Sequence, residues 1–251
     1  MMKVLNDWIK NGAVMVVALA MAGVAVAAEA EPTAAQMLKW VRINSSGQEM
    51  DTTGHLRTSE GKKVPFALRM DRGAISFSFT RPKETLTLDL SGGKQDVLVK
   101  DASGKVRKLT SKSYGQSIRG TDANFEDIAL RFLFWESASF EKDPKSGKRI
   151  VESVATRDCF KIRANNPRRE GPYAAVFAWV DRESGALMRV QGYNWQGKCV
   201  KQFEVISARK MKKGWVLKEM RIDRIDAGTG KVVARTWLYL DKARKKSSPL
   251  F

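Results

Sequence analysis

The chain has 251 residues, of which 43% are hydrophobic and 29% charged, a composition typical of a globular protein with a sizeable core. This composition excludes a disordered or low-complexity chain and leaves room for one large domain or two small ones. The net charge of +18 and the pI near 10.0 favour an anionic partner, such as nucleic acid, anionic lipid, an acidic polymer or an acidic protein.

The N-terminal residues have the layout of a cleaved secretory signal peptide. Lys3 and Lys10 give a basic start, the apolar run Ala13–Ala22 is short for a bilayer span, and the small residues Ala25–Ala27 close it. We therefore predict a signal peptide over 1–27 and one mature domain over 28–251, with an uncleaved membrane anchor as the alternative. Removing the net +1 of residues 1–27 from +18 leaves +17 on the mature chain.

Export to a bacterial periplasm bears on which anionic partner the basic chain can meet and on whether its cysteines can form a disulfide. Nucleic acid is not expected as a natural partner there, and no cysteine near the cleavage site is placed to carry a lipid anchor. The two cysteines, Cys159 and Cys199, can form a disulfide in an oxidising compartment, but the sequence does not say whether they meet.

A first helix is predicted over residues 33–41, with Thr33 as its cap and Met37, Leu38 and Val41 on one face. From about residue 48 the apolar period is two, which predicts half-buried antiparallel strands. One face should carry Phe66, Leu68, Met70, Ile75, Phe77 and Phe79, followed by Leu86, Leu88 and Leu90. Further strands joined by short glycine turns are predicted over 173–181, 187–195, 201–210, 215–225 and 232–240.

The stretch GTDANFEDIALRFLFW (120–135) predicts a second helix that is apolar on nearly every side. Asn124 should cap it, with Asp127 in the reciprocal position of a capping box. Two helices are too few to cover a flat sheet of this size, so we expect a curved sheet with this helix inside it. An ordinary buried core helix is the alternative, and the sequence leaves both open.

Three stretches resemble the outer-membrane lipoprotein-sorting (LolA-like) family of exported carriers: GTDANFEDIA, the run from RDCFKIRANNP to KQFEV, and GWVLKEMRIDR with TWLYLD. The likeness extends over most of residues 33–251. It implies a mainly β fold with a few helices: an incomplete, half-open antiparallel β-barrel with a helical lid around a hydrophobic cavity. It also implies a soluble periplasmic protein that carries lipoprotein acyl chains or another lipid toward the outer membrane. We expect this protein to be a monomer.

Strand periodicity and the 120–135 segment supply the predicted cavity residues. They are Phe66, Leu68, Met70, Ile75, Phe77, Phe79, Phe125, Ile128, Phe132 and Trp179. The basic surface is expected to meet an anionic membrane surface or an inner-membrane transporter. A lipid-sensing regulatory or adaptor module is the alternative function.

Enzyme chemistry has little support in this sequence. His55 is the one histidine, and no nucleophile motif lies near it. We predict no metal site and no cofactor, because the histidine and cysteines do not form a cluster with ligand spacing. The stretch DANFED resembles the start of a calcium loop but has Asp127 where the loop needs glycine and Leu133 where it needs glutamate.

Overall fold

The computed structural model describes residues 31–46, 49–71, 73–89, 96–211 and 214–242. The predicted signal peptide, the cleavage site and Leu90 lie outside these residues. Residues from Pro32 onward form one compact unit, separate from Met1–Glu31. The predicted boundary between residues 27 and 28 therefore stays a prediction.

The described chain is mainly β, as predicted, and its strands form one 14-stranded antiparallel sheet. The hydrogen-bonded order is β6-β5-β4-β3-β2-β1-β14-β13-β12-β11-β10-β9-β7, with β8 also paired to β9. The strands are β1 (Met50–Thr58), β2 (Lys63–Asp71), β3 (Ala74–Thr80), β4 (Lys83–Asp89), β5 (Asp96–Lys100), β6 (Val106–Lys108), β7 (Ala138–Phe140), β8 (Val151–Val154), β9 (Arg157–Asn165), β10 (Ala175–Asp181), β11 (Leu187–Tyr193), β12 (Cys199–Met211), β13 (Gly214–Ile225) and β14 (Val232–Leu240).

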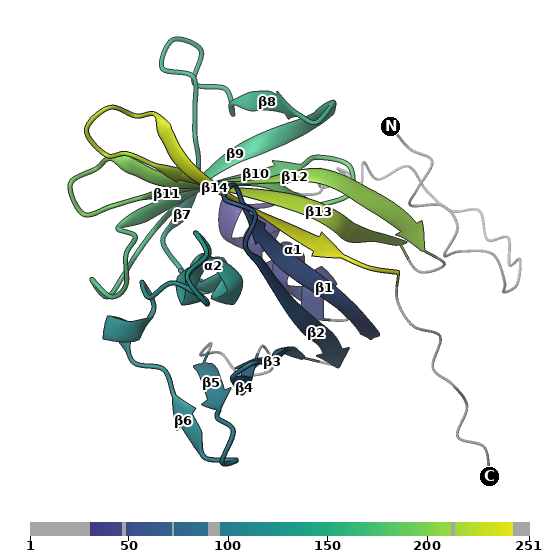
Figure 1. The fold of residues 1–251 in the computed structure, drawn as a ribbon. Coiled ribbons are helices and arrows are strands. Elements are labelled where there is room, and N and C mark those ends of the chain that lie inside the picture. Colours follow the sequence, from purple (N-terminus) through teal and green to yellow (C-terminus); the bar gives the residue numbers. More distant parts are fainter. Residues whose placement is uncertain (1–30, 47–48, 72, 90–95, 212–213, 243–251) are drawn as a thin grey trace, which may run out of the picture. The chain divides into compact units, whose positions relative to one another are not determined.

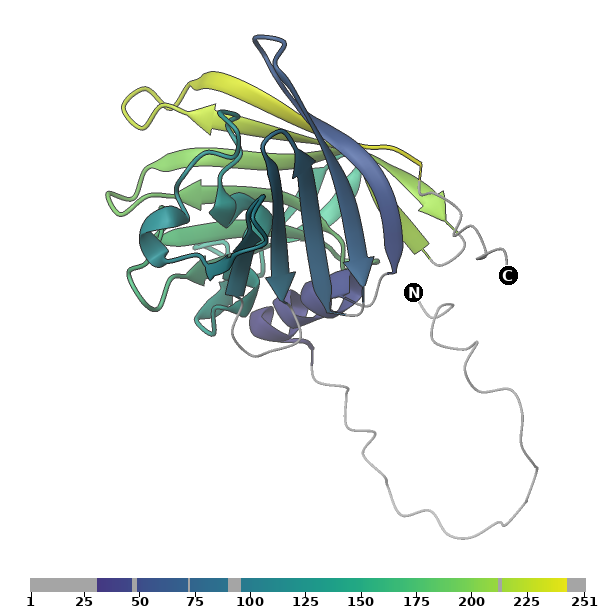
Figure 2. The ribbon, with the colours of Figure 1, turned by 60° about the horizontal axis from the view of Figure 1, so that its bottom comes forward.

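The sheet is open, because its order runs from β6 at one edge to β7 at the other and no pairing between them occurs in the described chain. It is strongly curved, and the helices lie on its concave side (Figures 1 and 2). These helices are α1 (Ala34–Ser46) and α2 (Phe125–Ala129), with the 3₁₀ turns η2 (Ser111–Ser113) and η3 (Arg131–Phe134). The predicted incomplete barrel with helices on its inner side is confirmed.

Helix α1 begins at the predicted cap. The Thr33 hydroxyl accepts a hydrogen bond from the Gln36 backbone N–H (3.2 Å), and the Gln36 side chain accepts from the Thr33 N–H (2.7 Å). Met37, Leu38 and Val41 are buried in the main hydrophobic core, so the predicted apolar face is the one that packs. The helix continues to Ser46, beyond the predicted end at residue 41.

The period-two strands place their apolar side chains as predicted. Phe66, Leu68, Phe77 and Phe79 are buried in the main core, while Ala67 and Arg69 between them are exposed. The wet face of the same strands is polar: the Ser76 and Ser78 hydroxyls lie 3.1 Å from those of Thr87 and Thr85. One face is therefore dry and the other wet, as antiparallel sheets with one covered face require.

The two cysteines do not form a disulfide. Both thiols are free, and β9 and β12 are separated in the sheet by β10 and β11. Strands are spaced about 4.8 Å apart, so three intervals put these strands about 14 Å apart, about twice the Cα separation that a disulfide tolerates. The sequence left this pairing open, because strand order is not readable from residue spacing, and the structure keeps the two cysteines apart.

Candidate functional site

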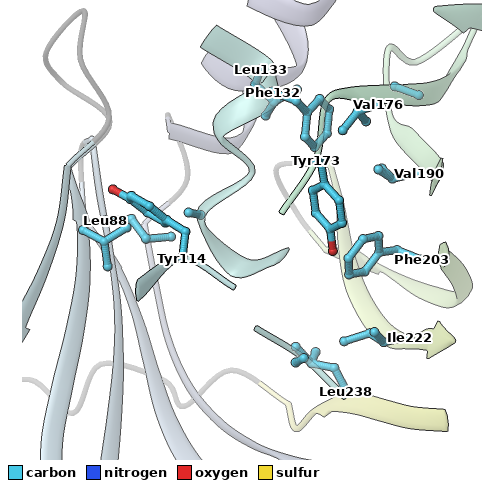
Figure 3. Close-up of a cluster of buried hydrophobic side chains, with 14 of the residues drawn as sticks. Leu88, Tyr114, Phe132, Leu133, Tyr173, Val176, Val190, Phe203, Ile222 and Leu238 are labelled. Carbon is cyan, nitrogen blue, oxygen red and sulfur yellow. The ribbon is translucent and has the colours of Figure 1, made fainter. Parts of the chain in front are cut away.

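The concave face of the sheet is the main apolar surface of the described chain. Inward side chains from β1 to β5 and from β9 to β14 join one hydrophobic core with α1 and the segment Tyr114–Trp135, called here the covering segment. Figure 3 shows side chains approaching this segment from both sides, with Leu88 on one side and Val190 and Phe203 on the other. The core is thus a layer between a curved wall on one side and α1 with the covering segment on the other.

An apolar pocket remains between the wall and the covering segment, with a volume of ≈ 20 Å³. It is lined by Leu56, Phe66, Phe77, Phe79, Ile118, Ala123, Asp127, Ile128, Met220, Ile222 and Leu238. A space of this size holds about one water molecule. The segment that was expected to lie inside the curved sheet therefore fills most of the predicted hydrophobic cavity in this structure.

The aromatic part of the wall depends on a glycine in β1. Phe66 packs edge-on against Phe77 and Phe79, with ring centroids 5.4 and 6.2 Å apart. A Cβ atom at Gly54 would come within 2.9 Å of the Phe66 ring. Gly54 therefore lets the Phe66 ring lie across β1 and join the cluster.

The structure brings together nine of the ten predicted cavity residues. Phe66, Phe77, Phe79 and Ile128 line the pocket. The others in the same core without lining it are Leu68, Met70, Ile75, Phe125 and Phe132. This places the residues together but does not test whether they bind a ligand.

Trp179 is on the wrong side of the sheet for a cavity residue. Along β10, Val176, Ala178 and Val180 face the main core, whereas Trp179 packs with Val154 in a second small cluster. Its indole Nε1 donates to Glu152 on β8 (2.8 Å). Lys161 and Arg189 also lie over the Trp179 ring, so β10 is buried on both faces and its apolar residues do not alternate with polar ones.

The covering segment begins with the predicted capping box. The Asn124 side chain accepts from the Asp127 N–H (2.8 Å), and the Asp127 carboxylate accepts from the Asn124 N–H (2.8 Å). The predicted continuous helix is wrong, however, because α2 ends at Ala129. Leu130 adopts a left-handed conformation (φ 48°), and the chain continues as η3.

This break has a physical reason in the packing. A left-handed non-glycine residue costs about 1–2 kcal/mol, so tertiary contacts must hold it. The turn that follows buries Phe132 and Leu133, while Phe125, Ile128 and Phe134 pack against the same core. The bend therefore lets the residues that follow Leu130 pack against the same core as those that precede it.

Asp127 is also the centre of a buried polar cluster, called here the Asp127 network: Asn124, Asp127, Tyr173 and Lys201. The Tyr173 hydroxyl donates to one Asp127 oxygen (2.5 Å), and the Lys201 ammonium lies 3.5 Å from the other. Asp127 and Lys201 are only 5% and 7% exposed. Burial raises the pKa of the Asp127 carboxyl, while Lys201 and the Tyr173 hydrogen bond oppose that rise.

A second set of polar contacts fixes the start of the segment to the sheet. The Asp122 carboxylate accepts from Arg224 on β13 and from the Thr236 hydroxyl on β14, both at 3.0 Å. The Lys201 ammonium on β12 donates to the Asp122 carbonyl oxygen. Three neighbouring strands therefore hold GTDANFED through polar groups, and not through apolar burial alone.

Glu126 forms a third polar contact on the other side of α2. Its carboxylate lies 3.3 Å from Arg131, which also reaches Glu170 (3.4 Å) and covers the Tyr114 ring at 4.0 Å. Burial raises the pKa of Glu126 to about 7, although Arg131 opposes this shift.

The covering segment separates the apolar pocket from a polar one of ≈ 350 Å³. The polar pocket is lined by Thr58, Ser59, Glu60, Gly115, Ser117, Gly120, Thr121, Asp122, Asn124, Lys201, Arg224 and Ala234. Ser117 and Asn124 thus face one pocket while their neighbours Ile118 and Ala123 face the other.

Sequence reasoning missed Tyr173, Lys201, Asp122 and Thr236. The one available signal was Lys201, a lysine on the same strand face as Phe203 in a strand whose apolar residues alternate. A charged residue on a dry face needs a buried partner, but the sequence does not say which acid supplies it.

His55 is a strand residue, as the sequence favoured, and its ring stacks on Tyr239 with centroids 4.9 Å apart. Among the described residues no group of three or more acidic, histidine or cysteine side chains is arranged to hold a metal ion. None of the helices in the described ranges is long and apolar enough to cross a bilayer.

Comparisons with known proteins agree with this fold. An outer membrane lipoprotein-sorting protein domain from Vibrio parahaemolyticus matches with a TM-score of 0.64 and 12% identity, covering 86% of this chain and 93% of that one. A LolA superfamily protein from Nitrosomonas europaea gives 0.61 and 14%, covering 87% and 96%. A DUF1329 family protein from Desulfovibrio piger gives 0.60 and 18%, covering 86% and 92%.

A search of curated proteins returned no match. A family model with the description "Uncharacterized protein" matches residues 76–245, well over half of the chain. The fold confirms the resemblance to lipoprotein-sorting proteins that the sequence indicated. The chain therefore belongs to the family that this model describes, and its fold is similar to that of a LolA superfamily protein.

Proposed function

We propose that this protein is a non-enzymatic periplasmic carrier that binds lipoprotein acyl chains, or another amphiphile, between the concave sheet and the covering segment. The observation that carries the proposal is a continuous apolar wall covered by α1 and by one short segment, which is bent at Leu130 and held to the sheet by buried polar contacts as well as by apolar packing. The fold shared with an outer membrane lipoprotein-sorting domain supports the same reading.

Cargo of this kind requires an open form of the protein. The pocket of ≈ 20 Å³ is far smaller than a ligand site of about 300–1,000 Å³. Burial of an acyl chain contributes ~0.8 kcal/mol for each methylene removed from water, so a long chain can compete with the side chains that fill the interior. The cargo then shifts the population toward the form in which the segment has left the wall.

Periplasmic location rests on the signal-peptide pattern of residues 1–27. A carrier of this kind binds by burial and needs no catalytic group, which agrees with a sequence that offers no nucleophile motif beside His55. We expect a monomer, because a single chain supplies both the wall and its cover.

The two faces of β3 provide the direct test. Phe77 lines the apolar pocket, whereas Ser78 lies on the opposite face and contacts Thr85. We expect Phe77→Ser to weaken the binding of an apolar fluorescent probe by roughly tenfold and Ser78→Ala to leave it unchanged, because only Phe77 contributes wall area. Binding is compared at equal folded fraction, since Phe77→Ser also lowers stability.

Equal effects of the two substitutions would remove the concave face as the binding surface. Native mass spectrometry of protein from its own host then identifies the occupant. Co-purified lipid or lipoprotein supports the carrier, whereas a stoichiometric protein partner on an empty interior supports a lipid-sensing adaptor.

A further inference from the structure

One end of the β12–β13 hairpin extends past the strands on either side of it. Strand β11 pairs with β12 only from Cys199 to Glu204, and β14 pairs with β13 only from Glu219 onward. In the described part of the chain, residues 208–211 pair with 214–217 and with no other strand. Figures 1 and 2 show this hairpin end projecting from the sheet.

The projecting end combines exposed apolar and cationic side chains. Trp215 is 54% exposed and Ile206, at the base, is 42% exposed. Lys210 lies directly opposite Trp215 across the hairpin, and Lys218 follows on the same strand; both are exposed. The sequence has no acidic residue between Glu204 and Glu219.

Protection of the strand edges accounts for only part of this pattern. Lysines on a free edge prevent pairing with another chain, but a large exposed indole does the opposite. Tryptophan is suited to the interface of a membrane, where its ring sits at the level of the headgroups. Lysines beside it can reach the phosphates of anionic lipids.

A lipid surface fits this patch better than a folded protein does. A stable protein interface buries about 800 Å² on each partner, which a hairpin end with two large apolar side chains does not offer. A bilayer needs only a small insertion, and the net charge of +18 on the chain attracts an anionic one over its whole surface.

We propose that the end of the β12–β13 hairpin, centred on Trp215, Lys210 and Lys218, docks the protein on membranes that contain anionic phospholipid. The Trp215 ring enters the headgroup layer and the two lysines pair with lipid phosphates. This goes beyond the carrier function, because docking needs no cargo and uses none of the residues that line the apolar pocket.

The test is sedimentation of the full mature chain with vesicles of phosphatidylcholine, with and without phosphatidylglycerol. The wild type should bind the mixed vesicles more tightly, and salt should weaken that binding because exposed charges are screened. Lys210→Gln with Lys218→Gln should weaken it about 25-fold, at roughly fivefold for each lysine. Trp215→Ser should weaken it roughly tenfold, since part of the ring area no longer leaves water.

Trp195 provides the matched control. It is 39% exposed and lies in the turn between β11 and β12, at the opposite end of β12 from Trp215. Trp195→Ser should leave vesicle binding within twofold of the wild type. An equal loss for both tryptophans, or vesicle binding that ignores the Lys210 and Lys218 changes, would overturn the proposal.

Apolar-probe binding to the same variants keeps this proposal separate from the carrier function. Trp215→Ser should bind the probe as the wild type does, because the interior is intact. Normal vesicle binding with no probe binding in any variant would remove the carrier function and leave the docking surface in place.

Discussion

Asp127 has two roles, only one of which its sequence context indicates. The spacing of Asn124 and Asp127 predicts a capping box, and the box is present. The same carboxylate also accepts from Tyr173 and lies beside Lys201, residues that come 46 and 74 positions later in the chain. Local spacing predicts local hydrogen bonds, whereas these partners depend on which strands the segment lies against.

Trp179 and the two cysteines are further residues whose positions could not be predicted from local sequence. The aromatic run of β10 has no alternation, so the sequence cannot assign Trp179 to a face. The positions of Cys159 and Cys199 depend on strand order, which two residue numbers do not contain. Residue-scale predictions succeeded where alternation was strict, as for Phe66, Phe77 and Phe79.

Glu126 should make the stability of the fold depend on pH. Its folded pKa of about 7 lies above the ordinary value of 4.5, so the folded state holds a proton that the unfolded state has already lost between these values. The contribution is therefore fully present below about pH 4.5 and is lost as pH rises to 7, on the order of 1–3 kcal/mol. Denaturant melts between pH 5 and 8 measure it.

The Glu126→Gln variant should show a shallower fall in unfolding free energy over that range. Some slope should remain, because burial also raises the pKa of Asp127. Glu183→Gln, whose side chain is exposed and pairs with Arg157, is the control and should keep the wild-type slope. Parallel pH profiles for the wild type and Glu126→Gln would show that Glu126 is ionised throughout.

At the scale of elements, most strands could be predicted and the covering segment could not. Period-two runs bounded by glycine turns account for β2, β3 and β4 and for the strands of the second half. The short strands β6, β7 and β8 lack such runs and went unpredicted, because their pairing comes from neighbours and not from an amphipathic pattern of their own. The helix expected over 124–135 breaks at Leu130 because burial of η3 outweighs local helix propensity.

Phe132 tests whether the covering segment is a removable plug. An ordinary core phenylalanine loses about 3–5 kcal/mol of stability when changed to alanine. We expect Phe132→Ala to lose less than this and to bind an apolar probe as well as the wild type or better, because the closed form is weakened more than the rest of the fold. A denaturant melt and a probe titration on the same variant provide both numbers.

Leu86 on β4 is the matched comparison, since it is buried in the wall and not in the segment. Leu86→Ala should lose about 2–5 kcal/mol with no gain in probe affinity. If Phe132→Ala behaves in the same way, the segment is part of the permanent core and the plug interpretation fails.

At the scale of the molecule, the concave face of the sheet and the segments that cover it depend on each other. The open sheet has a concave face that must be covered, and the described chain covers it with α1 and a segment held by buried polar groups. The pattern of predicted elements indicated that such a cover was needed, because the two predicted helices were too few to cover the apolar face of so many half-buried strands. The segment that was expected to lie inside the curved sheet does fill the interior, where Ile118, Ala123 and Ile128 line the small pocket that remains. The bend at Leu130 was not predicted.

The central claim is that an acyl chain enters by displacing the covering segment from an otherwise unchanged wall. Hydrogen exchange of the mature protein, measured with and without saturating palmitate, tests it most directly. The backbone N–H groups of Ile128, Leu130, Leu133 and Trp135 all bond within the segment, so they report its opening separately from the strands. The account predicts faster exchange of these amides with palmitate bound, while those of β3 and β13 stay protected. Slower exchange in the segment and the sheet alike, at confirmed saturation, would show that the ligand binds without opening the interior and would contradict the account.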